Sequence, residues 1–240
     1  MLKTRLSQER GQADHGWLKS FYTFSFADYQ DPGFNGFRAL RVINEDRVEP
    51  GQGFGRHPHD NMEILSYVLE GSLEHKDSMG TGSVLKPGDV QVMSAGTGVA
   101  HSEFNPSWLE PVHFLQIWMF PDARNLKPRY DQKHFPEGDK KDRLLLIASK
   151  SGREGSVVIH QDIELYASKL SAGKKLEAPL REGSGFWLQL VEGQLSVQGQ
   201  ILSSGDALYG EGEKALEIKA GRDSHFLLFD LGPFHRPARA

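Results

Sequence analysis

The fold is decided by two short stretches, GQGFGRHPHDNME at residues 51–63 and GTGVAHSEFN at residues 96–105. Each contains two candidate metal ligands spaced two residues apart, His57 with His59 and His101 with Glu103. Side chains at positions i and i+2 of an extended strand point to the same face. Facing strands bring cross-strand neighbours to within about 4.5–5.5 Å. We therefore expect the two pairs to converge on one divalent first-row metal ion, which imidazole nitrogen and carboxylate oxygen both suit.

A single His-x-His pair would be unremarkable as a chance feature of a surface strand. Here both pairs lie beside glycine-rich turns and extended apolar runs, which favours a metal site. Residues 63–69 (EILSYVL) run through Glu70-Gly71 into a second apolar segment, which predicts two strands joined by a tight turn. Pro87-Gly88 is typical of a type II turn. Residues 112–120 (VHFLQIWMF) predict a long strand, so we expect an all-β chain.

The second half of the chain repeats part of this pattern. VLEGSL at 68–73 resembles LVEGQL at 190–195, and KPGDV at 86–90 resembles SSGDA at 203–207. The same hairpin and the same turn recur at similar separation, which predicts a duplicated β unit. The second copy has no histidine at either ligand stretch, so we expect one metal ion per chain, bound in the first half.

These features divide the chain into four parts. We expect an N-terminal metal-binding domain at 1–132 and a metal-free C-terminal domain at 143–231. The polar residues at 133–142 would form a linker, and residues 232–240 a mobile tail.

Composition narrows the class of protein. A net charge of −4 argues against direct binding to nucleic acid, whose partners usually carry a basic face. The absence of cysteine excludes disulfides, thiolate nucleophiles and sulfur ligands. No apolar run is long enough to cross a membrane, and the first ten residues lack the apolar core of a signal peptide. We therefore expect a soluble protein of the cytoplasm.

The two stretches resemble the motifs of the cupin superfamily. Residues 51–71 resemble the first cupin motif in their order of Gly, His-x-His, Glu and Gly. Residues 98–105 resemble the second, although Gly96 stands where cupins usually have proline. More specific strings resemble the pirin family: HGWL (15–18), TFSFA (23–27), GFRALRVIN (36–44), HPH (57–59), MSAGTG (93–98), HSE (101–103) and QIW (116–118). The resemblance is dense in the first half and thin in the second.

The resemblance to pirin implies a bicupin, that is, two antiparallel jelly-roll β-barrels packed together, with a metal only in the N-terminal cupin domain. The family's ligand positions correspond here to His57, His59, His101 and Glu103. Fe(II) is the expected ion. Cu, Zn, Ni, Mn and Co are alternatives, because such a ligand set does not by itself select one first-row metal.

Glu63 and Glu103 compete for the role of acidic ligand. Many cupins take this ligand from the first motif, which would nominate Glu63. A turn after His59 would mean that Glu63 need not face the same side as the two histidines of its motif. Glu103 lies two residues from His101 on an expected strand, so both must face the same side. Glu103 is also the candidate catalytic residue, since a carboxylate within reach of a bound substrate could accept its hydroxyl proton.

Aromatic residues near the ligand stretches are candidate walls of a pocket for a flat substrate: Phe24, Phe26, Phe54 and Trp118. The alternation of Phe24 and Phe26 predicts a strand. Gln116 and His113 have opposite parity on the expected strand 112–120, so only one can face the interior. We expect Gln116 to do so.

Two functions remain in competition. Bacterial pirins are associated with quercetin 2,3-dioxygenase activity, so the first is a metal-dependent dioxygenase that opens the ring of quercetin or a related flavonol with O₂ and releases carbon monoxide. Animal pirin is an iron-bound nuclear co-regulator of transcription, so the second is a redox- or ligand-sensing module that acts through protein partners. A deep pocket ending at the metal would favour the first, and a closed metal shell or a large exposed apolar patch the second. A cupin isomerase or epimerase is less favoured, because the pirin-like strings point elsewhere.

Overall fold

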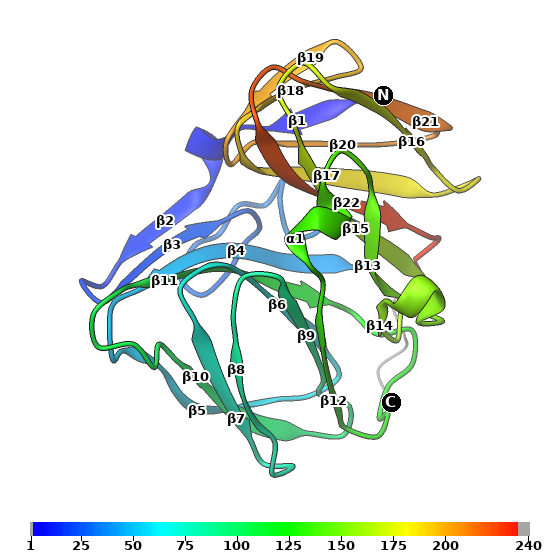
Figure 1. Ribbon diagram of the computed structural model, residues 1–240. Coiled ribbons are helices and arrows are strands. Elements are labelled where there is room, and N and C mark those ends of the chain that lie inside the picture. The colour runs from blue at the N-terminus through cyan, green and yellow to red at the C-terminus, as the bar shows by residue number, and fades with distance from the viewer. Residues whose placement is uncertain (1, 235–240) are drawn as a thin grey trace. The chain divides into compact units, whose positions relative to one another are not determined.

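The computed structural model describes residues 2–234 and confirms an almost entirely β chain with antiparallel sheets (Figure 1). The chain forms two compact units. The N-terminal unit comprises Gly11–His134 and Val157–Gln161; the C-terminal unit comprises the residues up to Arg10, Phe135–Ser156 and Asp162–Phe234. Each unit has a larger sheet and a four-stranded sheet, and none of these sheets closes on itself. The expected barrels are therefore open sandwiches of two sheets.

The compact units do not follow the chain order that the sequence suggested. Residues before Gly11 join the C-terminal unit because β1 (Lys3–Arg5) pairs with β20 (Ala207–Glu211). Residues 157–161 join the N-terminal unit. The predicted domains at 1–132 and 143–231 and the predicted linker at 133–142 stay a prediction. The compact units differ from these bounds in the residues before Gly11 and in residues 157–161. Most of the predicted tail, residues 235–240, lies outside the described part of the chain.

The larger sheet of the N-terminal unit has the strand order β12-β9-β6-β11-β4-β3-β2, and the smaller has the order β5-β10-β7-β8. The strands of the larger sheet are β2 (Gly11–Asp14), β3 (Leu18–Tyr22), β4 (Leu40–Val48), β6 (Glu63–Glu70), β9 (Asp89–Ser94), β11 (Val112–Met119) and β12 (Arg129–His134). Those of the smaller sheet are β5 (Gly53–His59), β7 (Leu73–Asp77), β8 (Gly82–Leu85) and β10 (Val99–Phe104). The short strand β14 (Val157–Val158) also belongs to this unit.

An apolar cluster lies between the two sheets of the N-terminal unit. Leu73 and Leu85 of the smaller sheet pack with Val48, Val68 and Phe114 of the larger. Each such side chain contributes about 1.5–3 kcal/mol when removed from water. This contact holds the two sheets face to face.

In the C-terminal unit, the strands of the larger sheet follow the order β1-β20-β17-β22-β15-β13, and those of the smaller the order β16-β21-β18-β19. The bounds not yet given are β13 (Leu145–Ser149), β15 (Ile163–Leu170), β16 (Lys175–Pro179), β17 (Gly185–Glu192), β18 (Gln194–Val197), β19 (Gln200–Ser203), β21 (Ala215–Ala220) and β22 (Ser224–Leu231). A short α-helix, α1 (Glu137–Lys140), and two 3₁₀ turns, Ser7–Glu9 and Arg153–Gly155, complete the described elements.

The predicted internal repeat is present in the geometry of its turns. Gly71 and Gly193 both have positive φ, and an added Cβ would come within 2.5 and 2.3 Å of a backbone carbonyl oxygen, so only glycine fits either turn. In the second turn of each copy an aspartate accepts a backbone N–H three residues before it. Asp89 Oδ2 lies 2.9 Å from the nitrogen of Lys86, and Asp206 Oδ2 lies 2.8 Å from that of Ser203.

The interiors of the two copies differ. Counted from the shared Glu-Gly turn, Ser66 on β6 corresponds to Leu188 on β17. Leu188 packs with Phe226, Leu228, Leu216 and other apolar residues that fill the C-terminal unit. Ser66 instead makes hydrogen bonds inside the N-terminal unit. At this position the second copy therefore has an apolar side chain where the first copy has a polar one.

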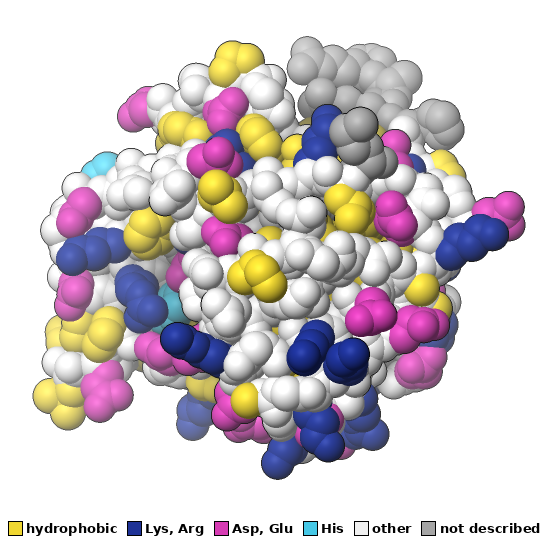
Figure 2. All heavy atoms as spheres, turned by 90° about the horizontal axis from the view of Figure 1, so that it is seen from above, with side chains coloured by type: hydrophobic (Ala, Val, Ile, Leu, Met, Phe, Trp, Pro, Cys, Tyr) yellow, Lys and Arg dark blue, Asp and Glu magenta, His cyan; other side chains and the backbone are white. Residues whose placement is uncertain are grey.

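On the face drawn in Figure 2, Lys and Arg side chains lie among Asp and Glu side chains without forming a continuous basic area. None of the described helices is long and apolar enough to cross a membrane.

Candidate metal centre

Three of the four sequence-predicted ligands meet between neighbouring strands of the smaller sheet. His57 lies opposite His101 in the register of β5 and β10, and His59 lies opposite Val99. Residues i and i+2 on β5 share a face, so His57 and His59 both point toward His101. Ring nitrogens of the three histidines lie within 4.8 Å of one another, which is close enough for a single ion to reach all three.

The hydrogen bonds of these histidines leave one ring nitrogen of each for a ligand. His57 Nδ1 lies 2.8 Å from the Gly55 carbonyl oxygen, so the N–H is on Nδ1 and Nε2 is left as the free acceptor. His59 Nε2 and His101 Nε2 are buried and have no hydrogen-bond partner among the described residues. Unpartnered buried nitrogen is costly. A divalent ion would satisfy all three nitrogens, so the donor set fits the metal that the cupin motifs imply.

Burial also sets the protonation state that metal binding needs. Desolvation, together with neighbouring histidines, lowers the pKa of His59 to about 4 and that of His101 to about 2. Both imidazoles are therefore neutral at physiological pH, and neutral imidazole is the form that coordinates metals.

Glu103, the fourth predicted ligand, borders the same cavity but is held toward the larger sheet. Ser66 Oγ donates to its carboxylate at 3.0 Å and Gln116 Nε2 donates at 2.6 Å. A carboxylate oxygen of Glu103 lies within 4.8 Å of ring nitrogens of His101 and His75. Glu103 does not belong to the group formed by the three predicted histidine ligands. Burial raises the pKa of Glu103 to about 7.

A cavity of about 230 Å³ opens onto this cluster. Twelve residues line it: Leu18, Ser20, Tyr22, Phe26, Asn44, Asp46, Phe54, His57, His59, Glu103, Gln116 and Trp118. Three of the four predicted aromatic wall residues, Phe26, Phe54 and Trp118, are among them, and the rings of Trp118 and His59 pack edge to face at 4.9 Å. The prediction of Phe24 as a wall residue is wrong, because Phe24 is buried away from the cavity.

The strand expected at Phe24 and Phe26 is also absent. β3 ends at Tyr22 and the chain turns, with Phe26 in an isolated bridge to Tyr29. This turn lets Phe26 pack edge to face against Trp118 at 5.4 Å. The expectation for β11 is confirmed, since Gln116 faces Glu103 whereas His113 bonds Glu45 on the other face.

Comparison with known proteins identifies the family of the chain. The Pirin model matches residues 3–119, and the model for the quercetinase C-terminal cupin domain matches residues 146–231. The chain is 48% identical to the quercetin 2,3-dioxygenase of Escherichia coli (strain K12) over 233 residues, which is 97% of this chain and 100% of that protein. The chain belongs to the pirin family. A pirin-like protein of Caulobacter vibrioides is 36% identical over 96% of this pirin and 99% of its own length.

Solved structures show the same fold. YhhW from Escherichia coli is 47% identical to this pirin and matches it with a TM-score of 0.94, covering 98% of this chain and 99% of that one. A complex of YhhW with nickel(II) matches with a TM-score of 0.93 at 47% identity, covering 97% and 100%. The two cupin domains of this pirin are therefore shown by family and by structure.

Glu63 has a different environment from Glu103 in this pirin. Its carboxylate accepts hydrogen bonds from Ser94 Oγ at 2.9 Å and from the backbone nitrogen of His160 at 3.0 Å. It neither lines the cavity nor belongs to a candidate ligand group among residues 2–234. Glu63 thus anchors the segment 157–161 within the N-terminal unit.

Two residues behind His101 were not predicted from the sequence. His75 Nδ1 lies 3.4 Å from His101 Nδ1, and His75 Nε2 lies 3.1 Å from Asp77 Oδ2; both side chains are fully buried. The spacing His75-x-Asp77 on an expected strand is the one signal that could have drawn attention to them, because both residues must share a face.

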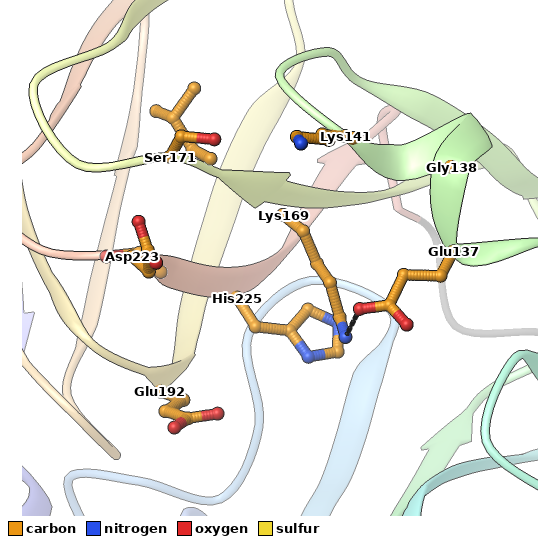
Figure 3. A pocket seen from close by; sticks show the side chains of 10 residues that line it. Glu137, Gly138, Lys141, Lys169, Ser171, Glu192, Asp223 and His225 are labelled. Atoms are coloured by element: carbon orange, nitrogen blue, oxygen red, sulfur yellow. Dashed lines mark hydrogen bonds and ion pairs between the residues drawn. The ribbon is translucent and has the colours of Figure 1, made fainter.

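The C-terminal unit of this pirin has a cavity of its own, of about 450 Å³, with different chemistry (Figure 3). Its single histidine, His225, lies beside Lys169, whose ammonium group pairs with Glu137. Burial and the neighbouring lysines lower the pKa of His225 to about 3. The two candidate metal groups found among the described residues both lie in the N-terminal unit.

Proposed function

We propose that this pirin is a metal-dependent dioxygenase that opens the ring of quercetin or a related flavonol with O₂ and releases carbon monoxide. One flavonol and one O₂ would give a ring-opened ester and one carbon monoxide, so no external reductant is needed. The observation that carries the proposal is the cluster of His57, His59 and His101, with free ring nitrogens, at an aromatic-lined cavity. The names of the similar bacterial proteins support it.

The chain's residues have distinct roles in this proposal. His57, His59 and His101 hold the ion, and Glu103 completes the ligand set. A bound divalent first-row ion would supply Lewis-acid and redox chemistry toward flavonol and O₂. Phe26, Phe54 and Trp118 offer flat apolar walls that position an aromatic ring and exclude water.

Glu103 is also the proposed proton acceptor. Its buried carboxylate takes the hydroxyl proton of the flavonol, which requires the carboxylate to lie within hydrogen-bond reach of the bound substrate. Ser66 and Gln116 hold the carboxylate by hydrogen bonds from the larger sheet. Ligation by Glu103 requires its carboxyl group to approach the three histidines more closely than it does in this structure.

Fe(II) is the proposed ion in the cell. The nickel complex of the similar YhhW indicates that the fold accepts first-row ions more generally. Metal analysis of anaerobically purified protein, followed by O₂ uptake and carbon monoxide release with a panel of flavonols, tests the proposal. Binding of flavonols by iron-loaded and copper-loaded protein without turnover would transfer support to the regulatory alternative.

That alternative, a sensing module acting through protein partners, has one feature in its favour. Trp108 and Leu109 are 84% and 87% exposed, side by side in the loop after β10. Two adjacent residues make a small patch, and the cavity beside the histidines fits an enzyme better. We further expect activity in the cytoplasm and no direct binding to DNA, given the net charge of −4.

A further inference from the structure

Three polar residues form part of the cavity wall without belonging to the candidate metal centre. Ser20 on β3 and Asn44 and Asp46 on β4 line the cavity and are only 2%, 3% and 4% exposed. In the register of the larger sheet Ser20 lies opposite Asp46, and Asn44 lies opposite Gln116. Register partners share a face of a sheet, so these side chains lie on the same face as Gln116, whose amide bonds Glu103.

The hydrogen bonding of these residues is incomplete. Asp46 Oδ1 accepts a hydrogen bond of 2.5 Å from Ser20 Oγ. Among residues 2–234 no Lys or Arg lines the cavity and no cation pairs with Asp46. Asn44 Oδ1 is buried without any partner. A carboxylate has room for about four hydrogen bonds, so acceptor capacity is left over beside the cavity.

Buried acceptors with incomplete hydrogen bonding, such as those of Asp46 and Asn44, lower the stability of the fold. Burying a carboxyl group without a cation, or an amide oxygen without a donor, disfavours folding. Among the other polar groups of the wall, Gln116 bonds Glu103, whereas the buried nitrogens His59 Nε2, assigned above to the ion, and Trp118 Nε1 also lack a partner. A ligand that brings its own hydroxyl donors into the cavity would satisfy the remaining acceptors.

We propose that Ser20, Asn44 and Asp46 form a subsite that binds a second hydroxyl group of an aromatic substrate, distinct from the hydroxyl that reaches the metal centre. The proposal rests on the proposed flavonol activity and deepens it by naming the substrate class as polyhydroxylated. The hydroxyl donates its one hydrogen to Asp46 or to Asn44 Oδ1, which lie on the same strand face. The cavity of about 230 Å³ is below the usual range for a drug-sized ligand, so it encloses only part of a flavonol.

Selectivity follows from the unpaired acceptors. A site built to bind a hydroxyl group rejects an analogue that lacks it, because the buried acceptors are then left without a donor. The test therefore compares quercetin with 3-hydroxyflavone, which has no hydroxyl besides the one on its central ring. Binding of both to nickel(II)-loaded protein is measured anaerobically by calorimetry, so no turnover is involved.

We expect the wild type to bind quercetin at least about tenfold more tightly than 3-hydroxyflavone. Asp46→Ala should reduce this ratio to within about threefold, mainly by weakening quercetin. Asp46→Asn, which keeps the shape of the side chain, should lower the ratio several-fold and covers the case in which the alanine variant does not fold. Asp131→Asn, on a half-exposed side chain outside the cavity, is the matched control and should keep the wild-type ratio.

The possible failures are distinguishable. If neither compound binds the wild type, the proposed function fails and the subsite fails with it. If both compounds bind but the ratio is near one in the wild type, or is unchanged in both Asp46 variants, the subsite alone is wrong and the flavonol activity can still stand.

Discussion

The Nδ1 atoms of His75 and His101 lie 3.4 Å apart inside the N-terminal unit, and one of them must carry the hydrogen. If His101 is to coordinate through Nε2, its hydrogen is on Nδ1 and His75 Nδ1 accepts it. His75 then carries its own hydrogen on Nε2 and donates to Asp77 Oδ2 at 3.1 Å. Asp77 Oδ1 is in turn held by the backbone nitrogens of Met79 and Thr81. This series of hydrogen bonds fixes one tautomer of His101.

The first prediction concerns the hydrogen bond between His101 and His75. His75→Phe keeps a ring against Tyr130, whose centroid lies 5.0 Å away, but removes the acceptor for His101. We expect metal affinity to fall about 10–100-fold, as is usual when the partner of a metal-bound histidine is lost. Competition with a chelator measures the change. His134→Phe, at a side chain that is 60% exposed, is the control. Equal affinities in His75→Phe and wild type would show that His75 does not position His101.

The second prediction is one metal ion per chain, lost when any of His57, His59 or His101 is replaced by alanine. The β fold should survive, because the apolar cluster that joins the two sheets of the N-terminal unit does not include these residues. Elemental analysis gives the stoichiometry and circular dichroism the fold. Two equivalent ions per chain would contradict the asymmetry of the repeat. Unfolding on chelation would make the ion a structural one.

The third prediction separates Glu103 from Glu63. Glu103→Gln should abolish turnover and weaken metal binding, because the amide can still coordinate but cannot accept a proton. Glu63→Gln should leave the metal in place and keep activity within roughly tenfold of the wild type, a barrier change near 1.4 kcal/mol. The reason is that the Glu63 carboxylate accepts hydrogen bonds from Ser94 and His160 and does not line the cavity. Steady-state O₂ uptake and metal content of both variants give the answer. Loss of metal only in Glu63→Gln would assign the acidic ligand to the first cupin motif.

The parts of the site that could be predicted are those set by local geometry. Strand parity brings His57 and His59 to one face, and the Glu70-Gly71 turn needs glycine wherever it occurs. His75 reaches His101 only because β7 pairs with β10, a long-range register that local patterns do not specify. The inclusion of residues 157–161 in the N-terminal unit likewise depends on the distant Glu63.

Departures from a family motif can also have local causes that the sequence does not reveal. Gly96 stands where cupins usually have proline, and its φ is +49° with the Leu126 carbonyl oxygen 2.0 Å from where a Cβ would be. Proline is restricted to a φ near −65°, so it cannot occupy this turn. The path of the chain near Leu126, and not the metal site, accounts for the difference.

The last prediction tests what the Asp46 carboxyl group costs the protein. Burial raises the pKa of Asp46 from 3.8 to about 7. The folded protein therefore binds more protons here than the unfolded chain between these values, and stability from this group is lost as pH rises through the same window. The neutral amide in Asp46→Asn has no such dependence. Relative to wild type, the variant should gain on the order of 2–4 kcal/mol in free energy of unfolding between pH 4 and pH 8.

Urea denaturation of metal-free protein at both pH values measures this gain, with Asp131→Asn expected to follow the wild type. A variant that tracks the wild type across this range would mean that Asp46 titrates normally. A gain would show that the protein keeps a destabilising carboxyl group in its cavity wall, as expected for a residue retained for binding and not for stability.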